Sequence, residues 1–322
     1  DAMGNLWLGT QGGITMYELS SQGWISMNTS TDPDLLDDAI MAVEVTSTGD
    51  IWFGTDFGIS VYDGTNWRSF TNADGLGNNR VNFIKESPTG EIWVGESDGL
   101  SVYDGTTWKA YGRNEGIPFG GITSLDFTED GIAWLGTGLS GVLIYDGTTF
   151  EPLDDARGLV SNKVTSVKRA NDMRMWVGTG SGISVFEADG QLVTNHTRIF
   201  ELPLPDTLNP VNDIEFDRNG VPFVGVYVDY LVTEGGLSFY AGGAWADYDM
   251  NDGLAGPAVN DVAIDEAGDV WVGTSTGLTY ITGLATGLDK ELGISFTVYP
   301  NPASSRLTIT RDESVQEATP IE

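Results

Sequence analysis

The sequence predicts an all-β protein, a β-propeller of four-stranded blades in which seven blades are expected. An aromatic-x-Gly motif recurs seven times with a period of 41 to 48 residues. Each period holds four short strand-like stretches, and no segment has helical periodicity. A repeat of this length with four strands in each copy is typical of propeller blades.

The repeat centres on a W-x-G motif, and its glycine is present in all seven copies. The aromatic positions are Trp7, Trp52, Trp93, Trp134, Trp176, Phe223 and Trp271. Twelve residues before each copy except the first stands Ile or Val, and another apolar residue follows three positions later. Residues three apart in a strand point to opposite faces, so we expect both faces of this strand, strand a, to be buried between blades.

The third copy shows the four strands in order. Strand a covers residues 81–85 and strand b covers 91–94, with a Ser-Pro-Thr-Gly turn between them. Strand c follows at 100–103, Asp104-Gly105 marks a hairpin, and strand d begins near Trp108. Every Trp in the chain lies in strand b or at the start of strand d, which predicts core packing rather than an aromatic platform for glycans.

These copies resemble the two-component regulator propeller repeat. The resemblance is carried by residues 49–55 (GDIWFGT), 58–62 (GISVY) and 252–254 (DGL), and it covers residues 1 to about 282. Blade six departs from the pattern at Pro222-Phe223 and Val226, and blade five has residues 171–174 (NDMR) in place of the acidic-glycine turn. Some propellers of this family are sensor modules for oligosaccharides, so the resemblance also implies a sensor-type ligand-binding domain.

The composition changes after the last copy. Residues 283–295 are expected to form a linker, and 296–322, with the motif Tyr299-Pro300-Asn301-Pro302, are similar to the start of the C-terminal sorting domain of the type IX secretion system. That resemblance implies a truncated small β-sandwich, the secretion machinery as partner, and a secreted or outer-surface location in a Bacteroidetes-like bacterium. In the propeller, residues 1–282, the first blade lacks strand a and the last lacks strand d. We expect upstream sequence to supply both.

Composition excludes several classes. The chain has 47 acidic and 15 basic residues and a formal net charge of -32, so nucleic acid is not an expected partner. The absence of cysteine excludes disulfides and thiolate metal sites. No apolar run is long enough for a membrane span. His196 is the only histidine, and it is expected in an irregular stretch after strand c of blade five, so a Ser-His-Asp site has little support.

Links b–c and d–a emerge at one end of the ring, where their lengths vary, and variable loops on a rigid scaffold often carry binding residues. Neutral drift of loop length is the other interpretation. The candidate ligand-binding residues at this end are Phe57, Asp56, Asp98, Phe119, Asn162, Tyr227, Asp229 and Tyr230. No cofactor is expected. Ca²⁺ is left open at Asp32, Asp34, Asp37 and Asp38, which crowd one link, although the pattern favours a solvated acidic loop.

The sequence therefore favours a secreted or cell-surface binding propeller that presents this end to a glycan or protein ligand. Three alternatives stay open: a carbohydrate-active enzyme on the propeller scaffold, a non-catalytic adhesion or spacer module, and the sensor-type domain. The enzyme would need a carboxylate pair that faces the channel, with a raised pKa on one member. No catalytic motif points to such a pair.

Overall fold

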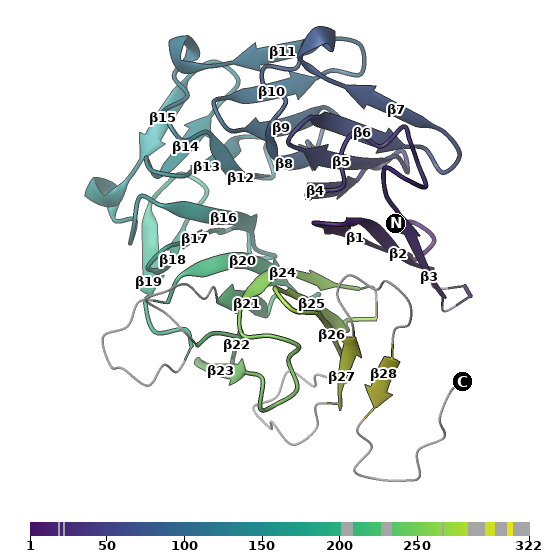
Figure 1. Ribbon diagram of the computed structural model, residues 1–322. Helices are drawn as coiled ribbons and strands as arrows, with labels where there is room; N and C mark the ends of the chain where they lie inside the picture. The colour runs from purple at the N-terminus through teal and green to yellow at the C-terminus, as the bar shows by residue number, and fades with distance from the viewer. Residues whose placement is uncertain are drawn as a thin grey trace.

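The computed structural model describes residues 1–18, 20–21, 23–200, 209–226, 234–265 and 267–282, and the backbone of 294–299 and 308–311. Seven antiparallel sheets surround a central axis, which makes the protein a seven-bladed β-propeller (Figure 1). The described residues contain no α-helix and only three short 3-10 helices. The fold class predicted for the propeller is confirmed.

The strands follow each other from the axis outward in every blade. Blade 1 contains β1 (Leu6–Thr10), β2 (Gly13–Glu18) and β3 (Gly23–Met27), and blade 2 contains β4 (Ile40–Val45), β5 (Ile51–Thr55), β6 (Gly58–Tyr62) and β7 (Trp67–Phe70). Blade 3 contains β8 (Val81–Glu86), β9 (Ile92–Glu96), β10 (Leu100–Tyr103) and β11 (Trp108–Tyr111), and blade 4 contains β12 (Ile122–Phe127), β13 (Ala133–Thr137), β14 (Val142–Tyr145) and β15 (Phe150–Leu153).

The second half of the ring repeats this order. Blade 5 contains β16 (Val164–Arg169), β17 (Met175–Thr179), β18 (Gly182–Phe186) and β19 (Leu192–His196), and blade 6 contains β20 (Val211–Phe216), β21 (Pro222–Val226), β22 (Leu237–Ala241) and β23 (Ala244–Tyr248). Blade 7 contains β24 (Val259–Ile264), β25 (Val270–Thr274) and β26 (Leu278–Thr282), extended by β27 (Ile294–Tyr299) and β28 (Thr308–Arg311). The 3-10 helices η1 (Asn72–Asp74), η2 (Arg113–Glu115) and η3 (Asp155–Arg157) lie in three d–a links.

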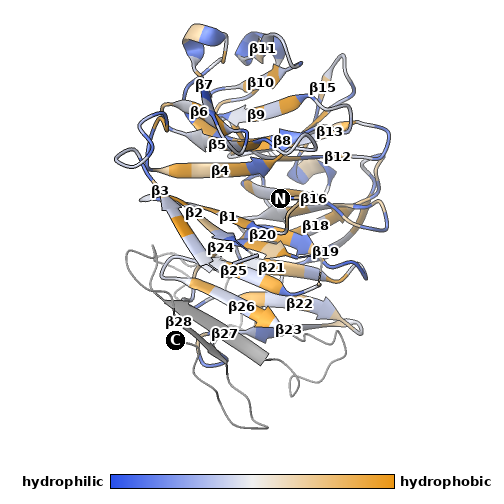
Figure 2. Ribbon diagram, turned by 90° about the vertical axis from the view of Figure 1, so that its right-hand side faces the viewer, coloured by the Kyte–Doolittle hydropathy of each residue, from blue (hydrophilic) through white to orange (hydrophobic). Residues whose placement is uncertain are grey.

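The Asp-Gly hairpins form because one carboxylate satisfies the turn. Asp63 accepts hydrogen bonds from the N–H groups of Thr65 and Asn66 at 2.8 and 2.7 Å, and Gly64 takes the left-handed conformation at φ 92°. A side chain would be strained there, whereas glycine is not. The hydropathy colouring shows the result: hydrophobic residues follow the strands, and the connections between them are mostly hydrophilic (Figure 2).

One expectation about strand a is wrong. Val164 and Val167, three apart in β16, both face blade 4, where they join a cluster with Trp134. The cause is a register shift between Val164 and Ser166, and each of the six strands β4, β8, β12, β16, β20 and β24 has the same irregularity. A bulge adds one residue to the strand and so restores both side chains to the same face.

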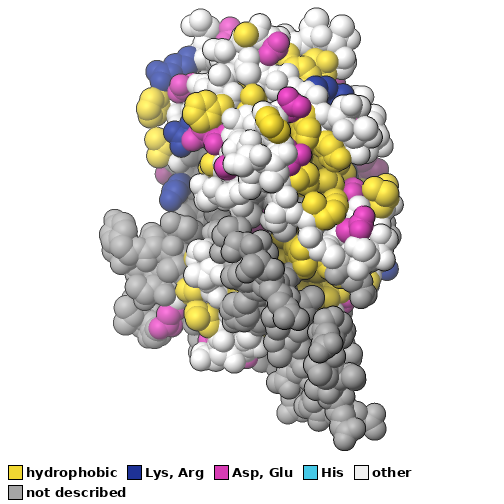
Figure 3. Space-filling view, turned by 45° about the vertical axis from the view of Figure 1, so that its right-hand side comes forward, with side chains coloured by type: hydrophobic (Ala, Val, Ile, Leu, Met, Phe, Trp, Pro, Cys, Tyr) yellow, Lys and Arg dark blue, Asp and Glu magenta, His cyan; other side chains and the backbone are white. Residues whose placement is uncertain are grey.

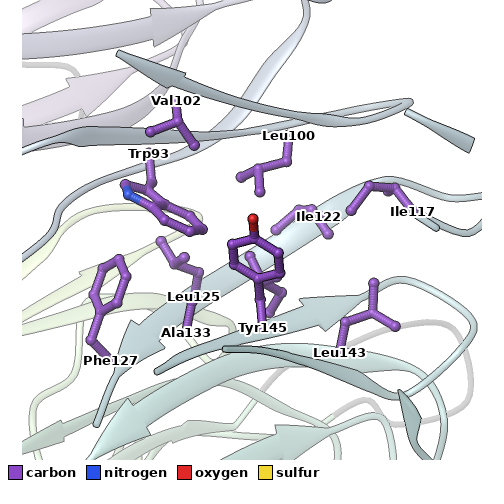
Figure 4. Packing of buried hydrophobic residues seen from close by; sticks show 11 residues of the cluster. Trp93, Leu100, Val102, Ile117, Ile122, Leu125, Phe127, Ala133, Leu143 and Tyr145 are labelled. Carbon is purple, nitrogen blue, oxygen red and sulfur yellow. The ribbon is translucent and has the colours of Figure 1, made fainter. Parts of the chain in front are cut away.

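The blades hold together through buried aromatic and aliphatic side chains. Between blades 3 and 4, Trp93 packs against Ile122 and Leu125, with the Phe127 ring edge-on at 5.3 Å (Figure 4). Trp134 is completely buried, and Trp52 is exposed by only 2%. The tryptophans of the repeat therefore pack between blades, as the sequence predicts.

The expectation of an irregular stretch around His196 in blade 5 is also wrong. The stretch that holds His196 is not irregular, because β19 pairs with β18 as an ordinary strand d. The imidazole stacks on Trp176 at 5.6 Å between ring centres and lies edge-on to Trp245. Burial lowers the pKa of His196. The only histidine is therefore a packing residue between blades 5 and 6.

The ends of the chain meet in blades 1 and 7. Tyr17 of β2 contacts Trp271 of β25 at 5.8 Å between ring centres, in a cluster that also includes Leu6 and Leu8. The place of strand d on β26 is taken by β27, at residues 294–299. This pairing crosses the expected linker boundary near residue 295. The division of the tail and its identity as a sorting domain stay predictions, and most of residues 283–322 lie outside the described part.

Candidate functional site

The b–c and d–a links form one end of the ring, which we call the loop face. Its fully described links are residues 11–12, 28–39, 56–57, 71–80, 97–99, 112–121, 138–141, 154–163, 180–181, 249–258 and 275–277. A threonine at the end of strand b fixes several b–c links: the Thr55 hydroxyl donates to the Gly58 carbonyl at 2.9 Å and accepts from the Phe57 N–H at 3.0 Å. The backbone of these links is thus rigidly held.

Two aromatic side chains project from this rigid frame. Phe57 is 61% exposed and Phe119 is 64% exposed, and among the described residues they are the only aromatic side chains exposed to this degree. The guanidinium of Arg113 lies 4.9 Å from the centre of the Phe119 ring. Leu139 is also 62% exposed. Large exposed apolar side chains on one surface mark interaction sites more often than scattered ones do.

The links that carry these residues adjoin one another across blades 2 to 4. Asp56, beside Phe57, forms an ion pair with Arg80 at 3.1 Å, and the Arg80 carbonyl accepts from the Ser97 N–H at 3.2 Å. The next link packs so closely on Ser97 that a Cβ at Gly121, where φ is 66°, would lie 2.5 Å from the Ser97 carbonyl oxygen. We call the side chains of Phe57, Asp56, Arg80, Arg113, Phe119 and Leu139 the apolar band.

The remaining predicted residues differ in role. Asp98 is exposed in the b–c link of blade 3. Asn162 is used internally: its side-chain oxygen accepts from the Asp155 N–H at 2.9 Å, and its carbonyl accepts from the Gly141 N–H at 2.9 Å. It positions two links, and a role in ligand binding stays a prediction. Tyr227, Asp229 and Tyr230 lie outside the described residues.

The carboxylates of the acidic link before blade 2 mostly bond to neighbouring groups of the same link. The Asp38 carboxylate accepts from the Thr29 N–H at 2.7 Å, and Asp37 accepts from the Asp38 N–H at 2.8 Å. Asp32 accepts from the Thr31 hydroxyl at 2.8 Å, and Asp34 is exposed. In the part of the chain that the structure describes, no three His, Cys, Asp or Glu side chains converge as metal ligands. Acidic side chains are also scattered over the side of the molecule seen in Figure 3.

A buried carboxyl lies directly beneath the loop face. Glu96, only 2% exposed, stands where five other blades have threonine, and it accepts from the Ser101 hydroxyl at 2.6 Å. Burial raises the pKa of Glu96 to about 7, although hydrogen bonds from Ser101 and from the backbone of Asn78 and Gly77 oppose the rise. Sequence reasoning missed this residue, but alignment of the copies would have found it as the one acidic residue at that position.

A carboxylate pair does face the channel, as the enzyme alternative requires. Asp261 is exposed at the surface of the innermost strand of blade 7. The protein groups that surround its carboxyl and the nearby Asp213 carboxylate raise the pKa of Asp261. The two carboxyl groups share a hydrogen bond. Glycosidases separate their carboxyl groups by about 5 Å or more, so this pair is too close for that chemistry. Asp213 also accepts from the Val262 N–H at 3.0 Å, which gives it a role between blades.

A cavity of about 350 Å³ lies at the opposite end of the ring, between blades 1 and 2. Met3, Trp7, Met16 and Ile51 are among its lining residues. None of the predicted ligand-binding residues lines it, so the predicted face and this cavity are separate features. We place the candidate site on the apolar band, because the exposed side chains of Phe57, Phe119 and Leu139 project there from links held by hydrogen bonds.

Comparison with known proteins adds evidence on the fold. No protein-family model and no curated protein matches the chain. Catalytically inactive virginiamycin B lyase from Staphylococcus aureus, solved with quinupristin, is similar at a TM-score of 0.64 and 15% identity, over 85% of this chain and 89% of that one. PorZ, a surface component of the type IX secretion system of Porphyromonas gingivalis, is similar at a TM-score of 0.64 and 16% identity, over 96% of this chain and 57% of that one.

The extracellular domain of a protein assigned to a hybrid two component system of B. thetaiotaomicron matches 91% of this chain and 47% of that one, with 20% identity and a TM-score of 0.42. That TM-score is too low to support an argument. In the described residues, no helix is long and apolar enough to cross a membrane. At these identities, the similarity shows that the chain shares the propeller fold with these proteins.

Proposed function

We propose that the protein is a binding propeller that docks a protein partner on the apolar band of its loop face. The observation that carries this proposal is the exposure of Phe57, Phe119 and Leu139 on links held rigid by backbone and threonine hydrogen bonds. A rigid frame lowers the entropic cost of binding, because few side chains must be ordered on contact.

The chemistry of the band favours a protein over a glycan. Phe and Leu have no hydrogen-bonding group, while aromatic residues, Met and Arg are enriched at the centres of protein interfaces. Arg80 is already engaged by Asp56, and Arg113 lies over the Phe119 ring, so the two guanidinium groups border an apolar centre. A sugar site needs several polar groups aimed at hydroxyls, whereas the charged groups of this band are engaged with each other or with the Phe119 ring.

We further propose that this binding occurs outside the cell, after export by the type IX route. The support is the tail motif of residues 299–302, which falls at the edge of the described backbone and beyond it. The large negative charge suits a soluble surface protein. Surface labelling in a bacterium with and without the type IX machinery tests this location, and equal labelling in both strains would contradict it.

Binding should depend on the two exposed rings. The double variant Phe57→Ala/Phe119→Ala is expected to lower the affinity for the partner at least tenfold, because truncation of one central aromatic side chain costs about 1 to 2 kcal/mol of binding energy. Stability should change little, since both rings project into solvent. The partner is identified by cross-linking to surface proteins, and its dissociation constant is then measured with the purified pair.

A matched control removes apolar side chains elsewhere. Leu192 and Val193, 41% and 40% exposed, lie on β19 at the outer edge of blade 5, so Leu192→Ala/Val193→Ala should leave the affinity unchanged. Equal binding by the Phe57→Ala/Phe119→Ala variant and the unchanged protein would contradict the site. If a glycan array gave binding that only the Phe double variant lost, the site would stand and the ligand class would be wrong.

A further inference from the structure

The cavity between blades 1 and 2, at the end of the ring opposite the loop face, has a volume typical of small-molecule sites. Its wall consists of the turn of residues 1–5 with β2 and β3 on one side, and of two turns of blade 2 with β5 and β6 on the other. Trp7 lines it from β1, and the indole packs on Phe53 and Tyr62 of blade 2 at 5.9 and 6.1 Å between ring centres. The cavity is therefore a gap in the packing between two blades.

The turn that carries Asp1 into the cavity wall has the geometry of an internal copy. The Asp1 carboxylate accepts from the Trp7 indole N–H at 2.9 Å and from two backbone N–H groups of its own turn at 3.0 and 2.9 Å. In blade 7, Asp265 accepts from the Trp271 indole N–H at 3.2 Å and from two backbone N–H groups at 2.9 and 3.0 Å. The place of the Asp1 carboxylate is thus fixed by the same contacts that hold the corresponding turn of blade 7.

The pairing register identifies the counterpart of this space in blade 2. One row of directly opposite residues crosses strands b, c and d of blade 1: Trp7, Met16 and Ile25. All three line the cavity, because opposite residues of paired strands point to the same face of a sheet. The same row in blade 2 consists of Trp52, Val61 and Arg68. Ile25 therefore stands where blade 2 has an arginine.

Blade 2 fills this space with its own guanidinium group. Arg68 lies 5.8 Å from the centre of the Trp52 ring and forms an ion pair with Asp50 at 2.5 Å. An aromatic ring attracts a cation over its face, and a carboxylate beside the ring holds the cation there. Blade 1 keeps the aromatic wall, which is Trp7, but has the shorter and uncharged Ile25 in place of the cation. The missing guanidinium accounts for the cavity.

The charges of the cavity wall also favour a cation. Its lining residues include three carboxylates: Asp1, Glu18 and Asp63. No lysine or arginine is among the lining residues that the structure describes. Asn5 stands where blade 2 has Asp50, and its side chain donates to the Asp1 carboxylate at 3.1 Å. Blade 1 therefore has a carboxylate beside the place from which Asp50 holds the arginine of blade 2.

We propose that this cavity binds an alkylguanidinium group, carried by a free small molecule or by an arginine side chain of a peptide. The planar group lies over the Trp7 ring and donates to the carboxylates of Asp1 and Glu18, while Met16 and Ile25 contact its alkyl stem. A guanidinium fits better than an ammonium, because it is planar, weakly hydrated and able to stack and donate at once. The cavity is separate from the apolar band, so the inference does not depend on the proposed function.

The test adds butylguanidinium chloride to the 322-residue chain labelled with ¹³C at its methionine methyl groups and records their NMR signals. Three methionines line the cavity: Met3, Met16 and Met27. Three others are exposed elsewhere and serve as internal controls: Met41, Met173 and Met250. We expect saturable shifts of the first three signals alone, and about fivefold weaker binding of butylammonium chloride, which lacks the planar face. Unmoved signals of the cavity methionines, or equal affinities for the two cations, would overturn the inference.

A peptide separates the two sources of the group. The capped tripeptide acetyl-Gly-Arg-Gly-amide produces the same shifts if the cavity accepts an arginine side chain. Shifts with butylguanidinium but not with the tripeptide would assign the cavity to a free small molecule.

Matched protein variants locate the site. Ile25→Arg places a guanidinium of the chain in the cavity, as in blade 2, and should abolish binding. Glu18→Gln removes one carboxylate and should weaken binding about threefold. Glu187→Gln changes the residue at the same position of blade 5 and should leave binding unchanged. Undiminished binding by the Ile25→Arg variant, or equal effects of the two Gln variants, would contradict the proposed site. The comparison between the two cations uses the unchanged protein and stays decisive even if a variant folds poorly.

Discussion

Replacing Trp134 by alanine is expected to lower the free energy of unfolding by about 3 to 5 kcal/mol, the largest effect of any single substitution considered. The indole is completely buried and packs against Phe186 at 5.9 Å between ring centres, in a cluster with Val164, Val167 and Met175. Removing it leaves a cavity between blades 4 and 5 that the surrounding strands cannot fill. Urea unfolding followed by fluorescence measures the loss.

A second substitution at the same position separates packing from hydrogen bonding. The Trp134 N–H has no hydrogen-bond partner in the described residues. Trp134→Phe therefore reduces the buried apolar surface area but also removes an unsatisfied hydrogen-bond donor. We expect Trp134→Phe to cost less than about half of what Trp134→Ala costs. Phe57→Ala, at an exposed ring, should change stability by no more than about 0.5 kcal/mol. Similar losses for Trp134→Ala and Phe57→Ala would contradict the core role.

Replacing Glu96 by glutamine is expected to stabilise the protein above pH 7 and to change little near pH 4. The pKa of Glu96 rises from 4.5 to about 7 in the folded state, so the folded protein holds a proton that the unfolded chain has lost over this interval. The contribution of the Glu96 carboxyl to the free energy of unfolding is therefore fully present below pH 4.5 and is lost as the pH rises through 7. The gain for Glu96→Gln at pH 8 is at most about 3 kcal/mol, the equivalent of that change in pKa.

The measurement is the unfolding midpoint in urea at pH 4, 6 and 8. Glu129→Gln, at an exposed turn on the opposite end, provides the control and should shift the midpoint equally at every pH. A pH profile for Glu96→Gln that runs parallel to that of the unchanged protein would show that the buried carboxyl is not responsible.

The number of blades and the places of most strands were readable from the sequence because the information is local. The W-x-G motif, the Asp-Gly turns and the branched residue twelve positions upstream repeat within each copy. Each blade is a meander whose strands pair with their immediate neighbours in the chain, so its pattern appears within some 45 consecutive residues. The exposure of Phe57 and Phe119 could be predicted from the same strand positions, because both residues lie in links between strands and do not recur in the other copies.

The direction of the side chains in strand a could not be obtained this way. A bulge leaves no mark in the hydrophobic pattern, and a strict two-residue alternation placed Val164 and Val167 on opposite faces. The strand formed by 192–196 was missed for a related reason: its outer position in blade 5 leaves most of it exposed, so burial imposes no alternation.

The sequence alone determined that this chain forms radially packed four-stranded blades with an aromatic core and a variable end. Only the tertiary structure decided which groups on different blades meet. The ion pair of Asp56 with Arg80 and the burial of Glu96 under a link both depend on how blades or links pack together. These contacts join residues far apart in the chain, such as Asn82 and Ile122, which are 40 positions apart, and no local pattern encodes such a distance.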